Sequence, residues 1–472
     1  MGTMSVQAAK TIRSAKTIYF SRRYKRGMKD GARICFGRLC IQQRHLASLS
    51  TSTVDRTMRI HLFCAAFPPF GRGGGPVGSE LIARALVSSG HEVEVVTVSD
   101  EPHQENRGEY RVCSLGSPNI YADYWRANPT WKKIIWHFLE NFNPVAFVRA
   151  HRRIRQFEPD LVMTVSIENI NVATWIAAKL NGLPVIHVLQ SYFVLCWRGS
   201  MYARGRKCEP YCKSCRVLCL GKRLAAKYVD AIVGETYFIN ASHINCSVFT
   251  KARQYVVPGP IDRLVAARSD AIVIPRQQNH LSIGYIGNIS PEKGVLTLAR
   301  AARRLCEDLG DKARFCIAGT GEKSFLTEVK AQFPSQLTEF MGWTTASTFY
   351  QAVDVVVVPS LFNEPFGRAA VEPLAYGVPV VVARSGGLPE TVEEGISGLV
   401  FTPDDDRELA RLLAELASDK ARLQALSKGA LARASHYSFS KFSSTLDRVV
   451  TQAWQEARCA CAYNFANKTR RY

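Results

Sequence analysis

Two glutamates eight positions apart follow a strongly apolar strand pattern, VDVVVVPS, in the second half of the chain. Glu364 is expected in the loop after that strand and Glu372 in the next helix, with Phe366 and Gly367 between them. Backbone N–H groups at the start of a helix point outward and bind anions such as phosphate. A glutamate further along can accept hydrogen bonds from sugar hydroxyls. The pattern predicts a site where a phosphate and a sugar meet. Two unrelated surface carboxylates are the alternative, which the small apolar neighbours of Glu372 disfavour.

A run of four cysteines is the second group that could carry chemistry. Cys208, Cys212, Cys215 and Cys219 have the spacing C-x3-C-x2-C-x3-C, with basic residues between them. Thiolates at this spacing can converge on one Zn2+ ion or on an iron–sulfur cluster. We predict a structural zinc site, and a loop of free or redox-sensitive thiols is the alternative. Because the sequence shows no pattern of a cleavable secretory signal, we expect a reducing compartment rather than a disulfide scaffold.

A glycine-rich stretch, Gly73–Gly78, reads GGGPVG and fits the pattern G-x-G-x-x-G. Asp100 follows at about the distance where a dinucleotide-binding unit places the acid that holds a ribose. These residues could therefore form a nicotinamide site. A single match of this kind is weak, so we do not favour that interpretation.

Alternating strand and helix patterns must position these residues. Short apolar runs at residues 59–66, 92–98, 160–165 and 184–189, and again at 281–287, 313–318, 354–358 and 378–383, are separated by helical patterns. This order is typical of parallel α/β sheets. We predict two doubly wound Rossmann-like domains facing a cleft, at residues 58–262 and 281–430. A linker at residues 263–280 joins them, and a helix at residues 431–457 follows.

An aromatic stretch, residues 121–147, contains Trp125, Trp131 and Trp136. We expect these side chains to pack in a helical core, in preference to contacting lipid. No run of about 18 apolar residues occurs, so no membrane-spanning helix is expected.

The segment Asn363–Glu372, NEPFGRAAVE, resembles the E-x7-E motif of the family 4 glycosyltransferases, which have the GT-B fold. The segment Tyr285–Gly294, YIGNISPEKG, is similar to that family's phosphate-binding loop. Further matches follow in the family's order over roughly residues 280–417: Gly319-Thr320-Gly321-Glu322, Gly342-Trp343, and the stretches 378–382, 386–390 and 395–400.

The resemblance implies retaining transfer of a hexosyl unit from a nucleotide-diphosphate sugar to an acceptor hydroxyl, with no cofactor required. Lys293 and the N–H groups at Phe366 and Gly367 would offset the charge of the diphosphate, Glu364 would hold sugar hydroxyls, and Glu372 the ribose. The donor site would also include Gly287, Asn288, Gly321 and Gly342, and the first-domain glycine loop with Gly74 and Gly75. The helix at 431–457 would cross back to the first domain. The acceptor would be a saccharide or a lipid-linked saccharide, in the synthesis of polysaccharide, glycolipid or cell-surface glycan.

Four positions depart from the family pattern. Gln190 stands where the family has the histidine that contacts the donor sugar, and Ser191 where it has aspartate. Asn288 replaces an arginine, and Pro373 follows Glu372 where alanine is common. We assign Gln190 to the transfer site with Glu364 and Lys293, and we expect nearby His187 to be a core residue. Together the departures motivate an alternative, a nucleotide-sugar-binding protein with weakened catalysis. Some family members carry a cysteine insert like that at residues 196–219.

The formal net charge of +21 is concentrated at the start of the chain, where residues 1–57 hold twelve cations and two acids. This segment could be a tail that contacts anionic lipid or nucleic acid, or a targeting segment. Alternatively, translation begins at Met58. We expect a cytoplasmic protein, with peripheral contact at the inner face of an anionic membrane and no nucleic-acid partner. A basic zinc-knuckle module that binds nucleic acid is a further, less favoured alternative.

Overall fold

The computed structural model of the protein describes residues 57–69, 73–99, 102–120, 129–208, 211–261 and 279–469. By its internal contacts the chain divides into Met1–Arg56 and Thr57–Tyr472, and every described residue belongs to the second unit. The predicted extension at 1–57 and linker at 263–280 therefore lie almost wholly outside the described residues, as do Asp100 and Trp125.

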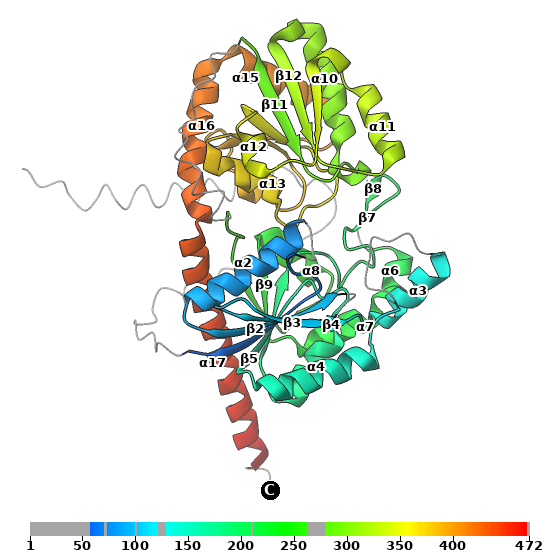
Figure 1. Ribbon diagram of the computed structural model, residues 1–472, viewed down its shortest axis with the longest axis vertical. Helices are drawn as coiled ribbons and strands as arrows, with labels where there is room; N and C mark the ends of the chain where they lie inside the picture. Colours follow the sequence, from blue (N-terminus) through cyan, green and yellow to red (C-terminus); the bar gives the residue numbers. More distant parts are fainter. Residues whose placement is uncertain are drawn as a thin grey trace, which may run out of the picture. The chain divides into compact units, whose positions relative to one another are not determined.

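The first Rossmann-like domain is built on an eight-stranded sheet of order β10-β9-β6-β5-β1-β2-β4-β3 (Figure 1). Its strands pair in parallel except β3, which runs antiparallel to β4. The strands are β1 (Arg59–Cys64), β2 (Glu92–Ser99), β3 (His103–Asn106), β4 (Arg111–Gly116), β5 (Leu161–Val165), β6 (Val185–Leu189), β9 (Ala231–Gly234) and β10 (Arg253–Val256). The helices are α2 (Gly74–Ser88), α3 (Thr130–Leu139), α4 (Pro144–Phe157), α5 (Ala173–Leu180), α6 (Lys213–Leu218), α7 (Leu220–Ala225), the 3-10 turn η2 (Ala226–Tyr228) and α8 (Tyr237–Asn245).

The second domain is built on a six-stranded parallel sheet of order β13-β12-β11-β14-β15-β16. Its strands are β11 (Leu281–Ile286), β12 (Ala313–Ala318), β13 (Thr338–Gly342), β14 (Val355–Val358), β15 (Val380–Ala383) and β16 (Gly398–Phe401). Its helices are α10 (Val295–Leu309), α11 (Lys323–Gln332), α12 (Ala346–Tyr350), α13 (Arg368–Val371), α14 (Leu388–Thr391), α15 (Asp406–Ser418) and α16 (Lys420–Ala434), with 3-10 turns at η3 (Pro291–Lys293), η4 (Gly310–Lys312), η5 (Ser335–Leu337), η6 (Glu372–Tyr376) and η7 (Ser435–Tyr437).

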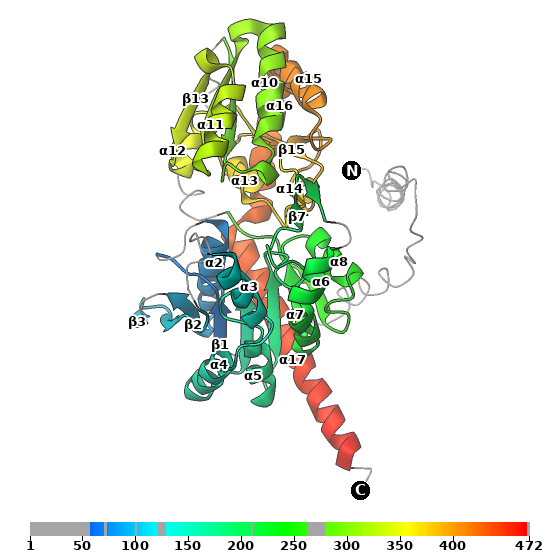
Figure 2. The same ribbon diagram turned by 90° about the vertical axis from the view of Figure 1, so that its right-hand side faces the viewer.

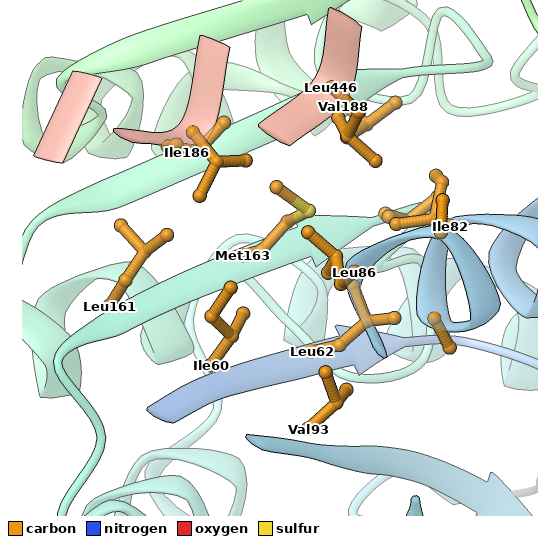
Figure 3. Packing of buried hydrophobic residues seen from close by; sticks show 14 of the residues in the cluster. Ile60, Leu62, Ile82, Leu86, Val93, Leu161, Met163, Ile186, Val188 and Leu446 are labelled. Atoms are coloured by element: carbon orange, nitrogen blue, oxygen red, sulfur yellow. The ribbon is translucent and has the colours of Figure 1, made fainter. Parts of the chain in front are cut away.

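Both faces of each sheet are covered by helices, which is why the central strands are apolar along their whole length. In the first domain α2 and the last helix, α17 (Phe439–Thr469), pack on one face (Figure 3). Helices α4 and α5 pack on the other face. In the second domain α10 and α15 cover one face, and α12 and α13 cover the other. This confirms the predicted fold class, two doubly wound α/β sheets.

Helix α17 returns from the second domain to the first. Its buried side chains Leu446 and Val450 join the core of the first sheet, and Ser443 Oγ lies 2.8 Å from Ser88 Oγ of α2. The predicted helix at 431–457 differs from the structure at both ends, because α16 and η7 occupy its first residues and α17, which begins at Phe439, continues to Thr469. No helix in the described ranges combines the length and apolarity needed to cross a bilayer.

The glycine stretch was predicted as a loop, and this is wrong from Gly74 onward, where α2 already begins. Pro76 is tolerated because the N–H groups of a first helical turn have no partner within the helix. A β-carbon at Gly78 would lie 2.5 Å from Gln190 Nε2, so a larger residue there would displace the Gln190 side chain. Glycine at this position therefore leaves room for the Gln190 amide beside the first turns of α2.

The aromatic stretch divides between core and surface. Trp136 is fully buried, as expected, but Trp131 is 59% exposed, which contradicts the core assignment for that residue. The cysteine-rich insert that follows β6 contains a short hairpin of β7 (Tyr202–Ala203) and β8 (Arg206–Lys207), and then α6 and α7.

Candidate functional site

Lys293 and Glu364, which were both assigned to the transfer site, lie in contact. The Nζ atom of Lys293 donates to Glu364 Oε1 at 2.8 Å, and Ser360 Oγ donates to the same oxygen at 2.7 Å. Glu364 is only 7% exposed, whereas the Lys293 side chain keeps more surface and stacks over the Phe362 ring. The pair combines a partly accessible cation with a fixed carboxylate.

The backbone holds this pair in place because two loops after neighbouring strands are tied together. The loop after β14 bonds to the loop after β11 through Leu361 N, which donates to Glu292 O at 2.9 Å. Gly387 N donates to Glu364 O at 2.7 Å. Glycine is required at Gly294, where φ is +70° and a β-carbon would lie 1.9 Å from Pro359 O. Both loops follow the carboxyl ends of strands, where ligands bind in such sheets.

Three of the predicted donor-site glycines form one surface beside the pair. Gly287 O would lie 1.8 Å from a β-carbon on Gly319, which excludes any side chain there. Gly319 N donates to Gly342 O at 2.7 Å, and Gly321 forms a β-bridge with Ile289. The loops after β11, β12 and β13 therefore contact one another through backbone atoms, with no side chain between them.

Asn288 stands at the rim of that surface. Its backbone oxygen accepts a hydrogen bond from Tyr285 Oη at 2.7 Å, and its side chain is exposed. The loop is therefore fixed through the backbone, and the side chain at this position is left facing solvent.

Glu372 is not in contact with Lys293 or Glu364. It lies where α13 gives way to η6, and Pro373 occupies the first turn of η6. Arg368 donates to Glu372 Oε1 from Nε at 2.9 Å, and Tyr350 Oη donates to Oε2 at 3.2 Å. Burial and the Glu372 carboxylate together raise the pKa of Tyr350 well above its usual value. The predicted ribose-binding carboxylate is therefore held by an arginine and a tyrosine.

Phe366 and Gly367 shape the turn before α13. The Phe366 ring is buried and packs 6.1 Å from the ring of Tyr437, so its side chain is a core group. Gly367 has φ +95°, and a β-carbon there would lie 2.4 Å from Leu388 Cδ2. At both residues only the backbone can contact a ligand.

Gln190, the residue in the family's histidine position, directly follows β6 and is held at both ends of its amide. Ser166 Oγ donates to Gln190 Oε1 at 3.4 Å, and the amide nitrogen donates to the carboxylate of Glu235. Burial raises the pKa of Glu235 to about 7, although Arg368 and the bond from Gln190 oppose that rise. Glu235 was not predicted from the sequence.

Glu235 is positioned by contacts on both sides of it. It follows β9, and Thr236 caps α8 while its Oγ1 donates to Pro365 O at 2.6 Å. Glu390 of α14 accepts from the backbone N–H groups of Tyr237 and Phe238 at 2.7 and 2.8 Å. Glu235 is half-buried, and it lines a small cavity with Gln190, Gly78 and aliphatic side chains.

Arg368 connects the two halves of the site, and the sequence reasoning missed it. A β-carbon on Gly74 would lie 3.2 Å from Arg368 Cδ, whereas one on Gly75 would meet nothing within 4 Å. Arg368 thus lies between the start of α2, Glu235 and Glu372. The signal was available, because Arg368 stands inside the motif that contains both glutamates.

The hairpin of the cysteine-rich insert reaches the second domain. Lys207 Nζ lies 3.4 Å from Ser385 Oγ, in the loop that also bonds to Glu364. Tyr202 lies near Glu292 and Asp404, whose negative charges add to burial in raising its pKa. The insert therefore brings a cation close to the loops that were predicted to bind the donor.

The thiols of the insert cluster around Cys215. Its sulfur lies 3.5 Å from that of Cys212, and it exchanges hydrogen bonds with the thiols of Cys196 and Cys219. Burial opposes ionisation of Cys212, but hydrogen bonds from Ser214 and Cys215 outweigh it and lower its pKa. In the described part of the chain, no three His, Cys, Asp or Glu side chains are arranged to hold a metal ion. The predicted ligand set with Cys208 is therefore not assembled here, and zinc binding stays a prediction.

His187 has the place expected for it. Its ring is 4% exposed, hydrogen-bonded to Thr164, and packed 5.1 Å from Trp175. Burial is the main reason that its pKa is lowered to about 3. It is a neutral core residue and does not contribute to the site.

Two family models match the chain, one on each domain. Residues 73–260 match the model described as a glycosyl transferase 4-like domain, and residues 270–433 match the model described as glycosyl transferases group 1. Among relatives, the "Uncharacterized 42.6 kDa protein in cps region" of Klebsiella pneumoniae is 27% identical over 71% of this chain and 87% of its own. D-inositol 3-phosphate glycosyltransferase of Thermobispora bispora is 29% identical over 59% of this chain and 67% of its own.

Solved structures show the same fold. Sucrose-phosphate synthase from Thermosynechococcus elongatus has a TM-score of 0.66 at 18% identity, covering 85% of this chain and 100% of that one. HepE of Anabaena, in complex with UDP, has a TM-score of 0.62 at 19% identity, covering 84% and 100%. With both domain models matched, over residues 73–260 and 270–433, the chain belongs to the GT-B glycosyltransferases of the group 1 and 4-like family.

Proposed function

We propose that this glycosyltransferase moves a hexosyl unit from a nucleotide-diphosphate sugar to an acceptor hydroxyl with retention of configuration. The observation that carries the proposal is the contact between Lys293 and Glu364 in two tied loops beside bare glycine backbone. A cation and a carboxylate so placed can bind the two ends of a sugar diphosphate.

In this proposal Lys293 stabilises the negative charge that develops on the diphosphate as the bond to the sugar breaks. A positioned charge of this kind typically contributes on the order of a hundredfold or more to the rate. Glu364 accepts hydrogen bonds from sugar hydroxyls, and Ser360 holds its carboxylate in place at 2.7 Å. The protein's cation carries this charge, so no cofactor is required for transfer.

Glu372 would bind the ribose hydroxyls in exchange for part of its pairing with Arg368. A carboxylate has two oxygens and several lone pairs, so it can accept from a ribose while keeping one bond to arginine. Arg368, 2.7 Å from Glu372, then remains available to face the phosphates. Lys207 is a further cation in reach of these loops. We assign it the contact with the diphosphate that the family's arginine would make and that the Asn288 side chain, which has no charge, cannot make.

Gln190 and Glu235 would act together at the sugar. An ionised carboxylate only accepts hydrogen bonds, so it keeps the Gln190 amide nitrogen turned toward Glu235. A protonated Glu235 can donate to the amide oxygen and so turn the amide over. Glu235 is therefore proposed as a positioning residue whose ionised form sets which group Gln190 presents to the sugar.

A uridine diphosphate sugar is the first donor to test, because the structural neighbour HepE has been crystallised with UDP and with UDP-glucose. The acceptor is proposed to be a saccharide or a lipid-linked saccharide, in the synthesis of polysaccharide, glycolipid or cell-surface glycan. The Klebsiella pneumoniae relative from a cps region supports a surface polysaccharide.

The test is a thermal-shift and turnover screen of UDP-, GDP- and ADP-sugars, with Glu372→Ala as a matched variant. We expect one donor class to raise the melting temperature, slow release of its nucleoside diphosphate, and loss of the stabilisation in the variant. The anomeric proton of the product, followed by NMR, should show the configuration of the donor. Stabilisation with no release for any acceptor would favour the second candidate, a donor-binding protein with weakened catalysis, which the Gln190 and Asn288 positions motivate. No stabilisation by any donor would contradict both.

A further inference from the structure

The outward face of α3 is apolar. Trp131, Ile134, Ile135 and Phe138 are 59%, 55%, 42% and 72% exposed, and they recur at the spacing that aligns side chains along one face of a helix. On most surface helices this stripe packs against the core. In α3 the opposite side is buried, with Trp136 at 0% exposed.

The apolar surface continues onto neighbouring helices. The large exposed apolar side chains on these helices are Phe142 just before α4, Val145 and Val148 of α4, Val217 of α6, and Leu220 and Leu224 of α7. Asn141 joins the two segments, since its Nδ2 donates to Leu218 O and its Oδ1 accepts from Gly221 N, both at 2.8 Å. Helices α3, α6 and α7 lie together in both ribbon views (Figure 2). We call this surface the α3–α7 face.

The concentration is uneven over the molecule. Residues 131–148 and 217–224 hold ten of the sixteen exposed large hydrophobic side chains found in the described residues. Contiguous exposed apolar patches of this kind mark interaction sites, whereas scattered single residues do not. We therefore expect the α3–α7 face to bind another surface.

The charges around the face have one sign. Lys133, Lys213 and Arg216 are exposed on the same helices. Residues 131–152 and 211–228 contain a single acid, Glu140, which is 1% exposed and paired with the buried Lys222 at 3.4 Å. Exposed apolar and aromatic groups are thus mixed with cations and with no exposed acid in these segments.

We propose that the α3–α7 face binds the surface of a lipid bilayer that contains anionic lipid. Helices that lie in the interface of a membrane bury an apolar face among the acyl chains, and their cations pair with anionic headgroups. Tryptophan and the long stems of lysine and arginine suit that boundary. An anionic lipid surface complements the exposed cations, and within residues 131–152 and 211–228 no exposed acid would repel it.

The proposal is tested by flotation of the full chain with vesicles of phosphatidylcholine, alone and mixed with phosphatidylglycerol. We expect the protein to float with the mixed vesicles. Trp131→Ser with Phe138→Ser should lower the vesicle-bound fraction at least about tenfold, because two anchoring side chains are lost. The matched control is Leu180→Ser with Ile396→Ser, which removes two exposed apolar side chains outside the face. It should bind as the wild type does.

Two further readouts keep the interpretation unambiguous. Melting temperature and donor turnover should be the same in the face variant and the control, since none of these residues belongs to the site. Residues 1–57 are basic and are present in every variant, so equal flotation of the face variant and the wild type would overturn the proposal. The proposal would also be wrong if the wild type did not float, or if the face variant instead converted a self-associated form into a monomer without changing vesicle binding.

Discussion

Replacing Glu235 by glutamine tests whether a titrating carboxylate controls the transfer site. Glutamine has nearly the same shape and can still exchange a hydrogen bond with Gln190, but it does not ionise. In the wild type, burial raises the pKa of Glu235 to about 7, so the carboxylate forms in the neutral range. Glu235→Gln should therefore remove the pH dependence of the transfer rate while a side chain of similar size still fills the position.

The size of the effect follows from the pKa. A group that titrates at about 7 is roughly one-tenth ionised at about pH 6 and nine-tenths ionised at about pH 8. If the ionised form is the active one, kcat rises close to tenfold over that interval. Arg368 is the charged group that faces Glu235, and Arg368 is paired with Glu372. The remaining described residues that line the cavity do not titrate, so a single ionisation should fit the profile.

The assay is the rate of nucleoside diphosphate release at saturating donor, measured across this pH range for the wild type and for Glu235→Gln. We expect the wild-type rate to rise with pH and the variant to show a flat profile. Glu390→Gln is the matched control, because burial also raises the pKa of Glu390, which contacts α8 and not Gln190. An unchanged rising limb in Glu235→Gln would refute the reasoning.

Stability gives an independent check on the same residue. The folded-state pKa of Glu235 is above that of an unfolded glutamate, so the folded protein holds the proton more tightly. Ionised Glu235 therefore lowers stability, and this cost grows as pH rises from about 4.5 to about 7, reaching at most about 3 kcal/mol. Glu235→Gln should melt closer to the wild type at low pH and gain relative stability at about pH 8.

Three further predictions concern the rest of the site. Lys207→Ala should raise the donor KM about threefold to tenfold, because a partly exposed cation contributes roughly 1 kcal/mol, and unchanged donor kinetics would exclude that role for the hairpin. Elemental analysis of protein purified without chelators should find zinc bound in a 1:1 ratio if the insert is a metal site, and a full set of reactive thiols with no metal would contradict the zinc prediction. Gly319→Ala should lose donor binding and stability together, since its β-carbon would lie 1.8 Å from Gly287 O, and a normally folded, active variant would show that this packing is misjudged.

Much of the fold could be read from the sequence because buried parallel strands are apolar along their whole length. Ala313–Ala318 was placed as the structure has it, and each of the other predicted strands differs from the structure by one or two residues at one end only. The strands that were missed include two short apolar ones of four residues, Ala231–Gly234 and Gly398–Phe401, and one with no apolar pattern at all. Residues His103–Asn106 are entirely polar, because β3 is an edge strand with one neighbour.

The second domain's site was the easier part to predict. Lys293 and Glu364 stand in loops after adjacent strands, β11 and β14, and each lies within a recognisable motif. At Glu235 the sequence shows only a single glutamate after a short strand. No neighbouring residue in the sequence indicates that this glutamate contacts Gln190 and Arg368. Its position at the carboxyl end of a parallel strand was the available signal.

The apolar stripe of α3 shows a different limit of sequence reasoning. Periodicity identifies which residues share a helix face, but it does not say whether that face meets the core or the outside. Trp136 and Trp131 belong to the same helix, and only their exposure in the structure separates them.

The central claim is that Lys293 and Glu364 carry transfer from a nucleotide sugar. The most direct measurement is the release of nucleoside diphosphate by the wild type, Lys293→Ala and Glu364→Ala, with melting curves to show that each variant is folded. The account predicts a loss on the order of a hundredfold or more in kcat/KM for each variant, with the fold intact. Near-full activity in both folded variants would contradict it.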